Sequence, residues 1–390
     1  MWSSRNSLSL VALCSTLSLV WLGCGRSSGT QAVPSATPSA ELSAHRAVAI
    51  DPALEGARTY EKYCQLCHAK DATGYAADNA PSLVSQTFLE SATDALIAAG
   101  IRMGRPGTAM AAYGQSRGGP LDEREISNIV RFLRSKGPQN HALPAASSNG
   151  DPTRGKTVFE QTCQTCHGTA TTRGNAVNLL NPELLNAASP AFLRYAVVNG
   201  RPPTPMPSFQ GKLTEEQIDD VVAWLWSSKP ALPTAAVREL TVPKNLPVVI
   251  NPKGKSPKFT MREERYVSVE QVKKALDAKQ RLVIIDARAA SDWIQFHIPG
   301  AISAPYHDNE QLERVPNDGT WVIAYCACPH HASGEVVDAL RAKKYANTAV
   351  MDEGILFWKD HGYPLVGEAV PTPAVPSASG AAKPAAPPKH

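Results

Sequence analysis

The sequence has no cluster of basic residues, and its formal charge is only +4. Proteins that hold nucleic acid by charge carry such clusters, so we expect no nucleic-acid partner. Charged residues make up 19% of the chain and hydrophobic residues 43%. This balance supplies several packed cores and excludes wholesale disorder. The length of 390 residues is typical of two to four domains.

Long apolar runs are also scarce, and the clearest one spans residues 8–22. It follows Arg5 and is shorter than a membrane-spanning helix, so we interpret residues 1–24 as an export signal. The step Gly23-Cys24-Gly25 resembles a bacterial lipoprotein cleavage site. We therefore expect lipidation of Cys24 and anchoring to a membrane in the periplasm. Cleavage without a lipid, or an uncleaved anchoring helix, are the alternatives.

The chain has only eight cysteines, and each can be assigned to the leader or to a short motif. None is left over to form a framework of structural disulfides. Cys14 lies within the leader, and Cys24 is the lipidation candidate. The others form two Cys-x-x-Cys pairs and one Cys-x-Cys pair: Cys64 with Cys67, Cys163 with Cys166, and Cys326 with Cys328.

Stretches rich in Pro, Ser, Ala, Gly or Lys divide the chain into three expected domains. We predict two all-α domains followed by an α/β domain with a central parallel sheet. The expected boundaries are a signal peptide at 1–24, a linker at 25–49, domains at 50–136 and 152–229 joined by 137–151, a linker at 230–261, a third domain at 262–367 and a Pro/Ala-rich tail at 368–390.

The first two domains are an internal repeat. In each copy a Gly precedes an aromatic residue by four positions, and the aromatic precedes a Cys by four, so all three share one side of a helix. A helix with a capping-box start closes each copy. The repeated positions are Gly56, Tyr60, Cys64, Asp122 and Glu125 in the first copy, and Gly155, Phe159, Cys163, Thr214 and Gln217 in the second.

Each copy contains Cys-x-x-Cys-His, the attachment motif of c-type haem. Two thiols one helical turn apart can add to the two vinyl groups of a haem, and the adjoining His68 or His167 then lies beneath the iron. Zinc binding would need two further ligands nearby, and a thioredoxin-like pair would need a strand–helix setting. We therefore expect two covalent haems, held by Cys64, Cys67, Cys163 and Cys166.

Methionine is rare, with six residues in the whole chain, yet each copy places one on a Gly/Pro loop before its last helix. We expect Met110 and Met206 to be the second axial ligands, because a thioether opposite His raises the haem potential and closes the iron to small ligands. Met103 lies in a helical stretch and is interpreted as packing.

With these motifs, residues 50–136 and 152–229 each resemble a class I cytochrome c domain. The resemblance implies a small helical bundle around haem, with its first and last helices crossing, and electron transfer with redox partner proteins. It also implies which residues meet: Phe132 and Trp224 at the crossings, and Pro81 and Pro182 as braces of the proximal histidines.

The third domain alternates short strands and helices. Strands are expected at 282–286, 321–325 and 348–351, with a helix at 333–343. The sequences Asp286-Ala287-Arg288, His297-Ile298-Pro299-Gly300-Ala301 and Gly362-Tyr363-Pro364, together with Gly354 and Trp358, resemble rhodanese signatures. The resemblance implies a persulfide-carrying catalytic Cys at Cys326, with Asp286, Arg288 and His297 bracing the fold.

The loop after Cys326 departs from the usual rhodanese pattern. It lacks the usual Gly and Arg and instead has Cys328, Pro329, His330 and His331. Cys328 is an auxiliary candidate, able to resolve a persulfide or pair with Cys326, and the histidines can replace the cationic groups. An inactive domain kept for docking is the alternative.

Three functions remain open from the sequence. In the first, sulfane-sulfur chemistry on a small sulfur compound at Cys326 is linked to the haems of a periplasmic electron carrier. In the second, the protein is a pure electron shuttle whose rhodanese-like domain only binds. In the third, Cys326 and Cys328 form a disulfide-based redox sensor.

Overall fold

The computed structural model describes residues 51–146, 149–230, 241–308, 310–327 and 330–369. The expected signal peptide, the lipidation site Cys24 and the auxiliary candidate Cys328 lie outside these residues. No helix in the described ranges is long and apolar enough to cross a membrane.

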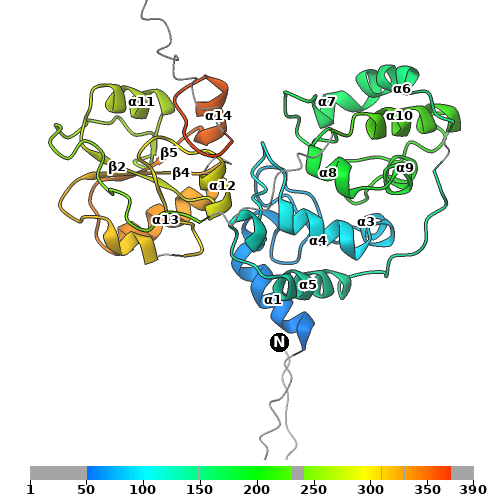
Figure 1. Cartoon of the computed structure of the whole chain (residues 1–390), viewed down its shortest axis with the longest axis horizontal. Coiled ribbons are helices and arrows are strands. Elements are labelled where there is room, and N and C mark those ends of the chain that lie inside the picture. The colour runs from blue at the N-terminus through cyan, green and yellow to red at the C-terminus, as the bar shows by residue number, and fades with distance from the viewer. Residues whose placement is uncertain (1–50, 147–148, 231–240, 309, 328–329, 370–390) are drawn as a thin grey trace, which may run out of the picture. The chain divides into compact units, whose positions relative to one another are not determined.

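The first repeat copy is helical throughout (Figure 1). Aspartate and proline start its first helix, since Asp51 caps the helix and Pro52 occupies the first turn, where no amide donor is needed. Its elements are α1 (Pro52–Tyr63), α2 (Gln65–His68), α3 (Gln86–Ser91), α4 (Asp94–Met103), η1 (Gln115–Arg117) and α5 (Glu123–Arg134).

The second copy repeats this order, with one local difference. The helix that leads to its attachment motif ends in a single π-helical turn, whereas α1 is α-helical up to Tyr63. The elements are α6 (Pro152–Val158), η2 (Phe159–Cys163), α7 (Gln164–His167), α8 (Pro182–Ala187), α9 (Pro190–Asn199) and α10 (Glu215–Ser227). Both predicted capping boxes are present, at the starts of α5 and α10.

The first and last helices of each copy cross at a glycine. A Cβ on Gly56 would lie 1.9 Å from the carbonyl oxygen of Asn128, and one on Gly155 would lie 1.9 Å from that of Asp220. Only the hydrogen of a glycine fits between the two crossing helices, so their backbones lie in direct contact. Beside each crossing an aromatic pair fills the core, with ring centroids 5.1 Å apart for Tyr60 and Phe132 and 4.5 Å apart for Phe159 and Trp224. The expected crossing partners are confirmed.

The two helical copies share one continuous apolar core. Helix α3 packs on α9, and α4 packs on α8. Polar bonds complete this contact: the Tyr195 hydroxyl donates to Glu90 at 2.8 Å, and the Asn181 amide donates to the carbonyl oxygen of Pro106 at 3.0 Å.

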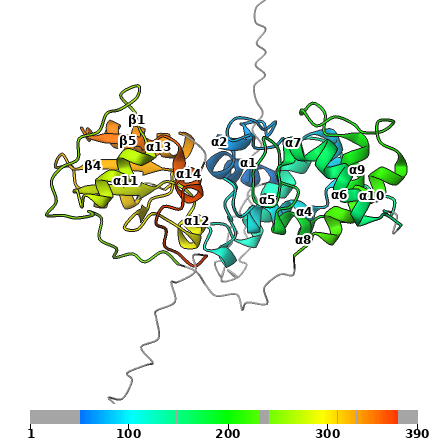
Figure 2. The same ribbon diagram turned by 90° about the horizontal axis from the view of Figure 1, so that it is seen from above.

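The C-terminal part is an α/β domain, and Figure 2 shows α11, α13 and α14 beside its strands β1, β4 and β5. Its five-stranded parallel sheet has the order β1-β5-β4-β2-β3. The strands are β1 (Tyr266–Val267), β2 (Leu282–Asp286), β3 (Ile302–Ser303), β4 (Trp321–Tyr325) and β5 (Thr348–Met351). The helices are α11 (Val269–Asp277), α12 (Ala290–Gln295), η3 (Glu310–Arg314), α13 (His331–Ala342) and α14 (Gly354–Asp360).

Helices cover both faces of this sheet, as an all-parallel sheet requires. Residues of α11 and α14 pack on one face, and residues of α13 and η3 pack on the other. All five residues of β2 are buried, which explains its uninterrupted apolar sequence. The predicted strands β2, β4 and β5 are confirmed, while the two-residue strands β1 and β3 were not predicted.

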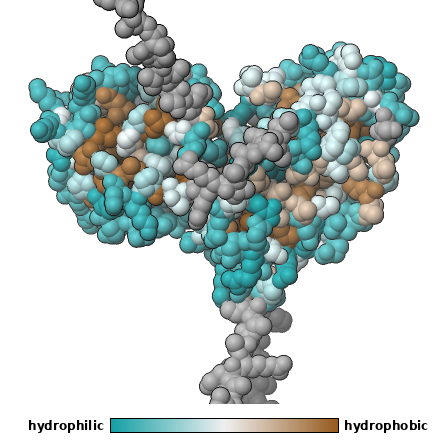
Figure 3. Space-filling model, viewed as in Figure 1, coloured by the Kyte–Doolittle hydropathy of each residue, from teal (hydrophilic) through white to brown (hydrophobic). Residues whose placement is uncertain are grey.

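The viewed face of the molecule is largely hydrophilic, with apolar residues gathered in patches (Figure 3). Among the described residues, the large apolar side chains that stand well exposed are Leu54, Tyr75, Trp226 and Val366.

Candidate functional site

The attachment motifs form because a helix delivers each Cys to a short second helix. Cys64 ends α1 and caps α2, which carries Cys67 and His68. The second copy does the same with Cys163, Cys166 and His167. Burial raises the pKa of the Cys64 thiol to about 12 and that of Cys163 to about 11. Both shifts have the same cause, since each of these cysteines lies at the junction of two packed helices.

Both candidate proximal histidines are buried, and a hydrogen bond from Nδ1 orients each ring in the same way. Nδ1 of His68 donates to the carbonyl oxygen of Pro81 at 2.9 Å, and Nδ1 of His167 donates to that of Val177 at 2.6 Å. Burial lowers the pKa of both imidazoles, which keeps them neutral. With the proton on Nδ1, the lone pair of Nε2 is available to a metal.

The brace of His68 by Pro81 is therefore confirmed, while the expected role of Pro182 is wrong. Pro182 instead occupies the first turn of α8, where proline is favoured. A backbone carbonyl of any residue can accept the histidine proton, so the residue type at that position is free to vary.

The two methionine loops are built alike. The amide of Arg105 donates to the carbonyl oxygen of Met110 at 2.7 Å, and that of Arg201 donates to Met206 at 3.0 Å. Each loop is tied back to the preceding helix, through Tyr113 to Ile101 and through Phe209 to Val197. The repeat therefore presents both methionines on equivalent short loops.

Sequence reasoning missed a pair of half-buried arginines on these loops, Arg105 and Arg201. Nη1 of Arg201 donates to the carbonyl oxygen of Thr87 at 2.9 Å, while Nη2 is buried without a hydrogen-bond partner among the described residues. Burial lowers the pKa of Arg201 to about 10 and also lowers that of Arg105. The repeated Gly-Arg-Pro before each methionine was the available signal.

The residues present fit a c-type haem. The neutral histidines offer Nε2, the thiols stand one turn apart, and the unpartnered Nη2 of Arg201 suits an acidic group such as a haem propionate. Within the described ranges no group of three or more His, Cys, Asp or Glu side chains can hold a metal ion.

In the α/β domain, Cys326 directly follows β4 and precedes α13. Its side chain is buried, and Sγ lies 3.2 Å from Oγ of Ser333. Its carbonyl oxygen accepts a hydrogen bond from the amide of Ile355 at 2.9 Å. A side chain on Gly354 would approach that same oxygen to 2.7 Å, and φ at Gly354 is +72°. Glycine there lets the backbone pass close beneath the cysteine.

His330 of the loop pairs with a carboxylate beyond the neighbouring strand. His330 has a left-handed backbone with φ of 80° and contacts Asp352 at 2.6 Å through Nε2. Asp352 also accepts two hydrogen bonds from Arg262, and these groups lower its pKa. His330 therefore anchors the loop to the strand end beside it.

The residues expected to brace the fold are buried in one network. Arg288 donates to Asp286 and to the carbonyl oxygen of Phe296, and the Tyr325 hydroxyl donates to Asp286 at 2.9 Å. His297 stacks on Trp293 with ring centroids 3.7 Å apart. These contacts agree with a structural role.

Comparison with known proteins defines the class. Residues 51–133 and 150–225 match the family model of cytochrome c oxidase, cbb3-type, subunit III, and residues 268–361 match that of the rhodanese-like domain. The chain is a cytochrome c protein with two cytochrome c segments followed by a rhodanese-like domain. The two cytochrome c segments match the cbb3-type subunit III model, and cytochrome c segments imply c-type haem.

Individual relatives cover only parts of the chain. It is 28% identical over 193 residues to the cbb3-type cytochrome c oxidase subunit CcoP of Azospirillum sp. (strain B510), covering 44% of this chain and 61% of that protein. It is 35% identical over 86 residues to dihydro-heme d1 dehydrogenase of Pseudomonas aeruginosa, covering 22% of this chain and 17% of that protein. Among solved structures, a thiosulfate sulfurtransferase of Pseudomonas aeruginosa is 28% identical, covers 26% of this chain and 20% of that chain, and has a TM-score of 0.25.

Proposed function

We propose that this protein is a periplasmic electron carrier with two haems, anchored by a lipid on Cys24, that takes electrons from sulfur chemistry at Cys326. The observation that carries the proposal is the repeated haem constellation in the same chain as a buried cysteine at the carboxyl end of a rhodanese-like strand. The haem sites are Cys64, Cys67, His68 and Met110, and Cys163, Cys166, His167 and Met206.

The proposed sulfur step is a two-electron oxidation. The Cys326 thiolate and one hydrosulfide ion, HS⁻, form an S–S bond, giving a persulfide anion, one proton and two electrons. Two bound haems, held by the Cys64–Cys67 and Cys163–Cys166 pairs, would supply the two one-electron acceptors that this step needs. Transfer of the outer sulfur to an acceptor thiolate then regenerates the Cys326 thiolate and gives the acceptor persulfide. A partner protein of an electron-transport chain reoxidises the haems.

The test uses matured protein loaded with oxidised haem and kept free of oxygen. Sulfide is added, and haem reduction is followed by absorbance while persulfide is counted by the thiocyanate that cyanide releases. Cys326→Ser supplies the background of direct chemical reduction. We expect fast reduction and one persulfide per chain in the unaltered protein alone.

Equal reduction in both proteins, with no persulfide, would favour a pure electron shuttle whose rhodanese-like domain is an inactive binding module. The redox-sensor alternative predicts a disulfide rather than a persulfide, which the same cyanide assay separates.

A further inference from the structure

The rhodanese-like domain contacts the first cytochrome copy through helix α12, which follows β2, and through the loop that follows β3. The hydroxyl of Tyr306, three residues after β3, donates to the carbonyl oxygen of Tyr63 at 2.9 Å. The hydroxyl of Ser291, after β2, donates to that of Ala112 at 2.6 Å. Cys326 follows β4 at this same end of the sheet, because all the strands are parallel.

The contacted residues of the cytochrome copy frame its haem constellation. Tyr63 precedes Cys64, and Leu66 stands between the two attachment cysteines. Ala109 precedes Met110, and Ala112 follows it by two positions. The contact therefore covers the attachment motif and the methionine loop together.

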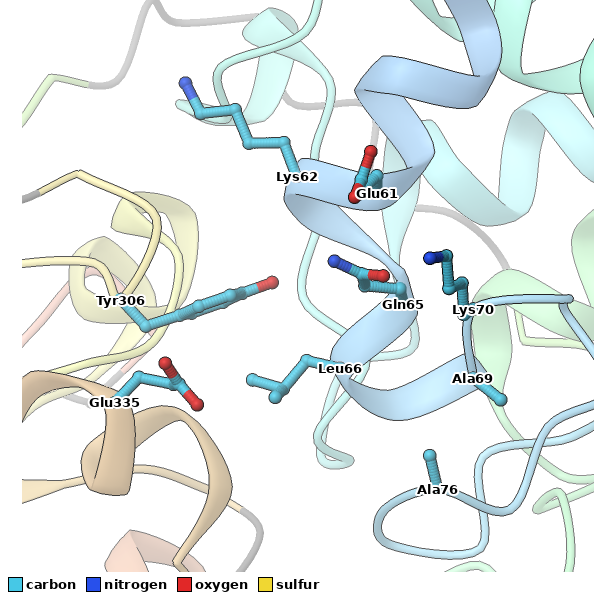
Figure 4. Close-up of a pocket in the computed structure, with 9 residues that line it drawn as sticks. All are labelled: Glu61, Lys62, Gln65, Leu66, Ala69, Lys70, Ala76, Tyr306 and Glu335. Atoms are coloured by element: carbon cyan, nitrogen blue, oxygen red, sulfur yellow. The ribbon is translucent and has the colours of Figure 1, made fainter. Parts of the chain in front are cut away.

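Apolar packing joins these segments to the sheet. Leu66 and Ala109 pack against the buried cluster that contains Cys326, and Ala109 also packs against the cluster on the other face, which contains Ala327. Figure 4 shows Tyr306 and Leu66 reaching toward each other beside an open hollow of about 530 Å³. Glu335 of α13, the helix that follows the Cys326 loop, lines the same hollow.

The second copy provides an internal comparison, because the same positions there are open. Tyr63, Leu66, Ala109, Ala111 and Ala112 are buried or half-buried. Their equivalents Thr162, Thr165, Pro205, Pro207 and Ser208 are all exposed. Likewise Cys67 is half-buried, while Cys166 is exposed. The two copies thus differ on this face, which is apolar and covered in the first copy and is lined by exposed Thr, Pro and Ser in the second.

We propose that the rhodanese-like domain is the built-in electron donor of the first cytochrome copy, so that electrons enter there and leave through the open face of the second copy to a separate redox protein. This inference rests on the proposed sulfur function for the origin of the electrons. The polarity of the exit face suits a transient partner, since brief redox contacts are small and wet. The apolar entry face suits a permanent contact.

A matched pair of charge insertions tests the route. Leu66→Lys puts a charge into the covered face, and Thr165→Lys puts the same charge at the equivalent open position. Both variants must carry as many haems per chain as the unaltered protein. Hydroxyl-radical labelling of Tyr63 and Tyr113, read by mass spectrometry, reports the contact without any reaction. Tyr306→Lys repeats the insertion from the other side and leaves the attachment motif intact.

We expect Leu66→Lys and Tyr306→Lys to raise the labelling of Tyr63 several-fold and to slow sulfide-driven haem reduction about tenfold. Thr165→Lys should change neither. Labelling of Tyr63 that is as strong in the unaltered protein as in Leu66→Lys would overturn the inference. So would unchanged reduction in both contact variants despite raised labelling. If the unaltered protein and Cys326→Ser are reduced by sulfide equally fast, the proposed sulfur function is overturned. The labelling of Tyr63 then still tests whether the two domains are in contact.

Discussion

The carbonyl oxygen of Pro81 lies 2.9 Å from Nδ1 of His68, at the position where it fixes the tautomer of the ring. Val177 serves His167 in the same way at 2.6 Å. Each ring therefore keeps its proton on the nitrogen that faces the protein. The opposite nitrogen is left as a ligand, and the question at each site becomes what occupies the sixth position on the iron.

Met110→Ala should open that position at one haem only. We expect the variant to bind about one carbon monoxide per chain after reduction, and the unaltered protein to bind none, because the thioether closes the site. Met206→Ala should behave alike, and the double variant should bind two. Absorbance titration measures the stoichiometry. Met103→Leu, at the end of α4, is the control, and carbon monoxide binding by it would contradict the assignment of Met110.

Gly155→Ala should destabilise the second copy by about 3 kcal/mol, because the added methyl group would overlap the carbonyl oxygen of Asp220. Guanidinium unfolding of haem-loaded protein measures the change. Gly211→Ala is the matched control. Gly211 has a positive φ of +74° and faces open space, so its cost comes from backbone conformation alone and should be only about 1 kcal/mol. A value for Gly155→Ala no larger than that for Gly211→Ala would contradict the crowding at the crossing.

Acid should loosen the contact between the rhodanese-like domain and the first cytochrome copy. Burial, aided by nearby Lys62, lowers the pKa of His307 to about 4, and its ring packs on Tyr63 with centroids 4.6 Å apart. The unfolded histidine binds a proton near pH 6.5, so stability is full above that pH and is lost as pH falls toward 4. We expect a loss of about 2 kcal/mol from this group.

His307→Phe should remove that share of the pH dependence. Unfolding measured at pH 7 and at pH 4.5 gives the slope for both proteins, and labelling of Tyr63 at the same two pH values reports the contact. An equal slope in the variant would assign the acid sensitivity to other groups.

Asp286→Ala should cost about 3–5 kcal/mol, because it leaves the guanidinium of Arg288 buried without its carboxylate. Thermal unfolding measures this. Asp338→Ala removes an exposed partner of Arg265 and should cost at most about 1 kcal/mol. If Asp286 only braces the fold, the persulfide yield per folded molecule should stay unchanged, and loss of that yield would give it a chemical role.

The sequence patterns that predicted structure correctly were those set by the geometry of a single helix or strand. The spacing of Gly56, Tyr60 and Cys64 predicted a helix face, and the glycine does lie at a crossing. The capping boxes and the buried strands β2, β4 and β5 followed from residue type and period alone. The haem ligands and Cys326 were also named from motifs, and their roles stay predictions.

What escaped prediction depends on contacts between distant segments. Strands β1 and β3 have two residues each, too few for a period. The brace of His167 comes from a backbone carbonyl, which leaves no trace in the sequence. The burial of Arg201 arises from Phe88 and Phe192 of different copies, and no local pattern reports their meeting. The sequence does show Leu66 in the first copy and Thr165 at the equivalent position of the second. This difference could not be interpreted without the rhodanese-like domain that covers Leu66.

The glycine crossings also bear on how the protein is made. Each cytochrome copy closes only when its last helix meets its first, at Gly56 with Asn128 and at Gly155 with Asp220. In the export proposed above, the attachment cysteines would emerge before that helix. Each copy would then stay open while its cysteines are accessible, which leaves an interval in which haem can be joined to them. Closure then seals the product, and a premature crossing would shut the haem out.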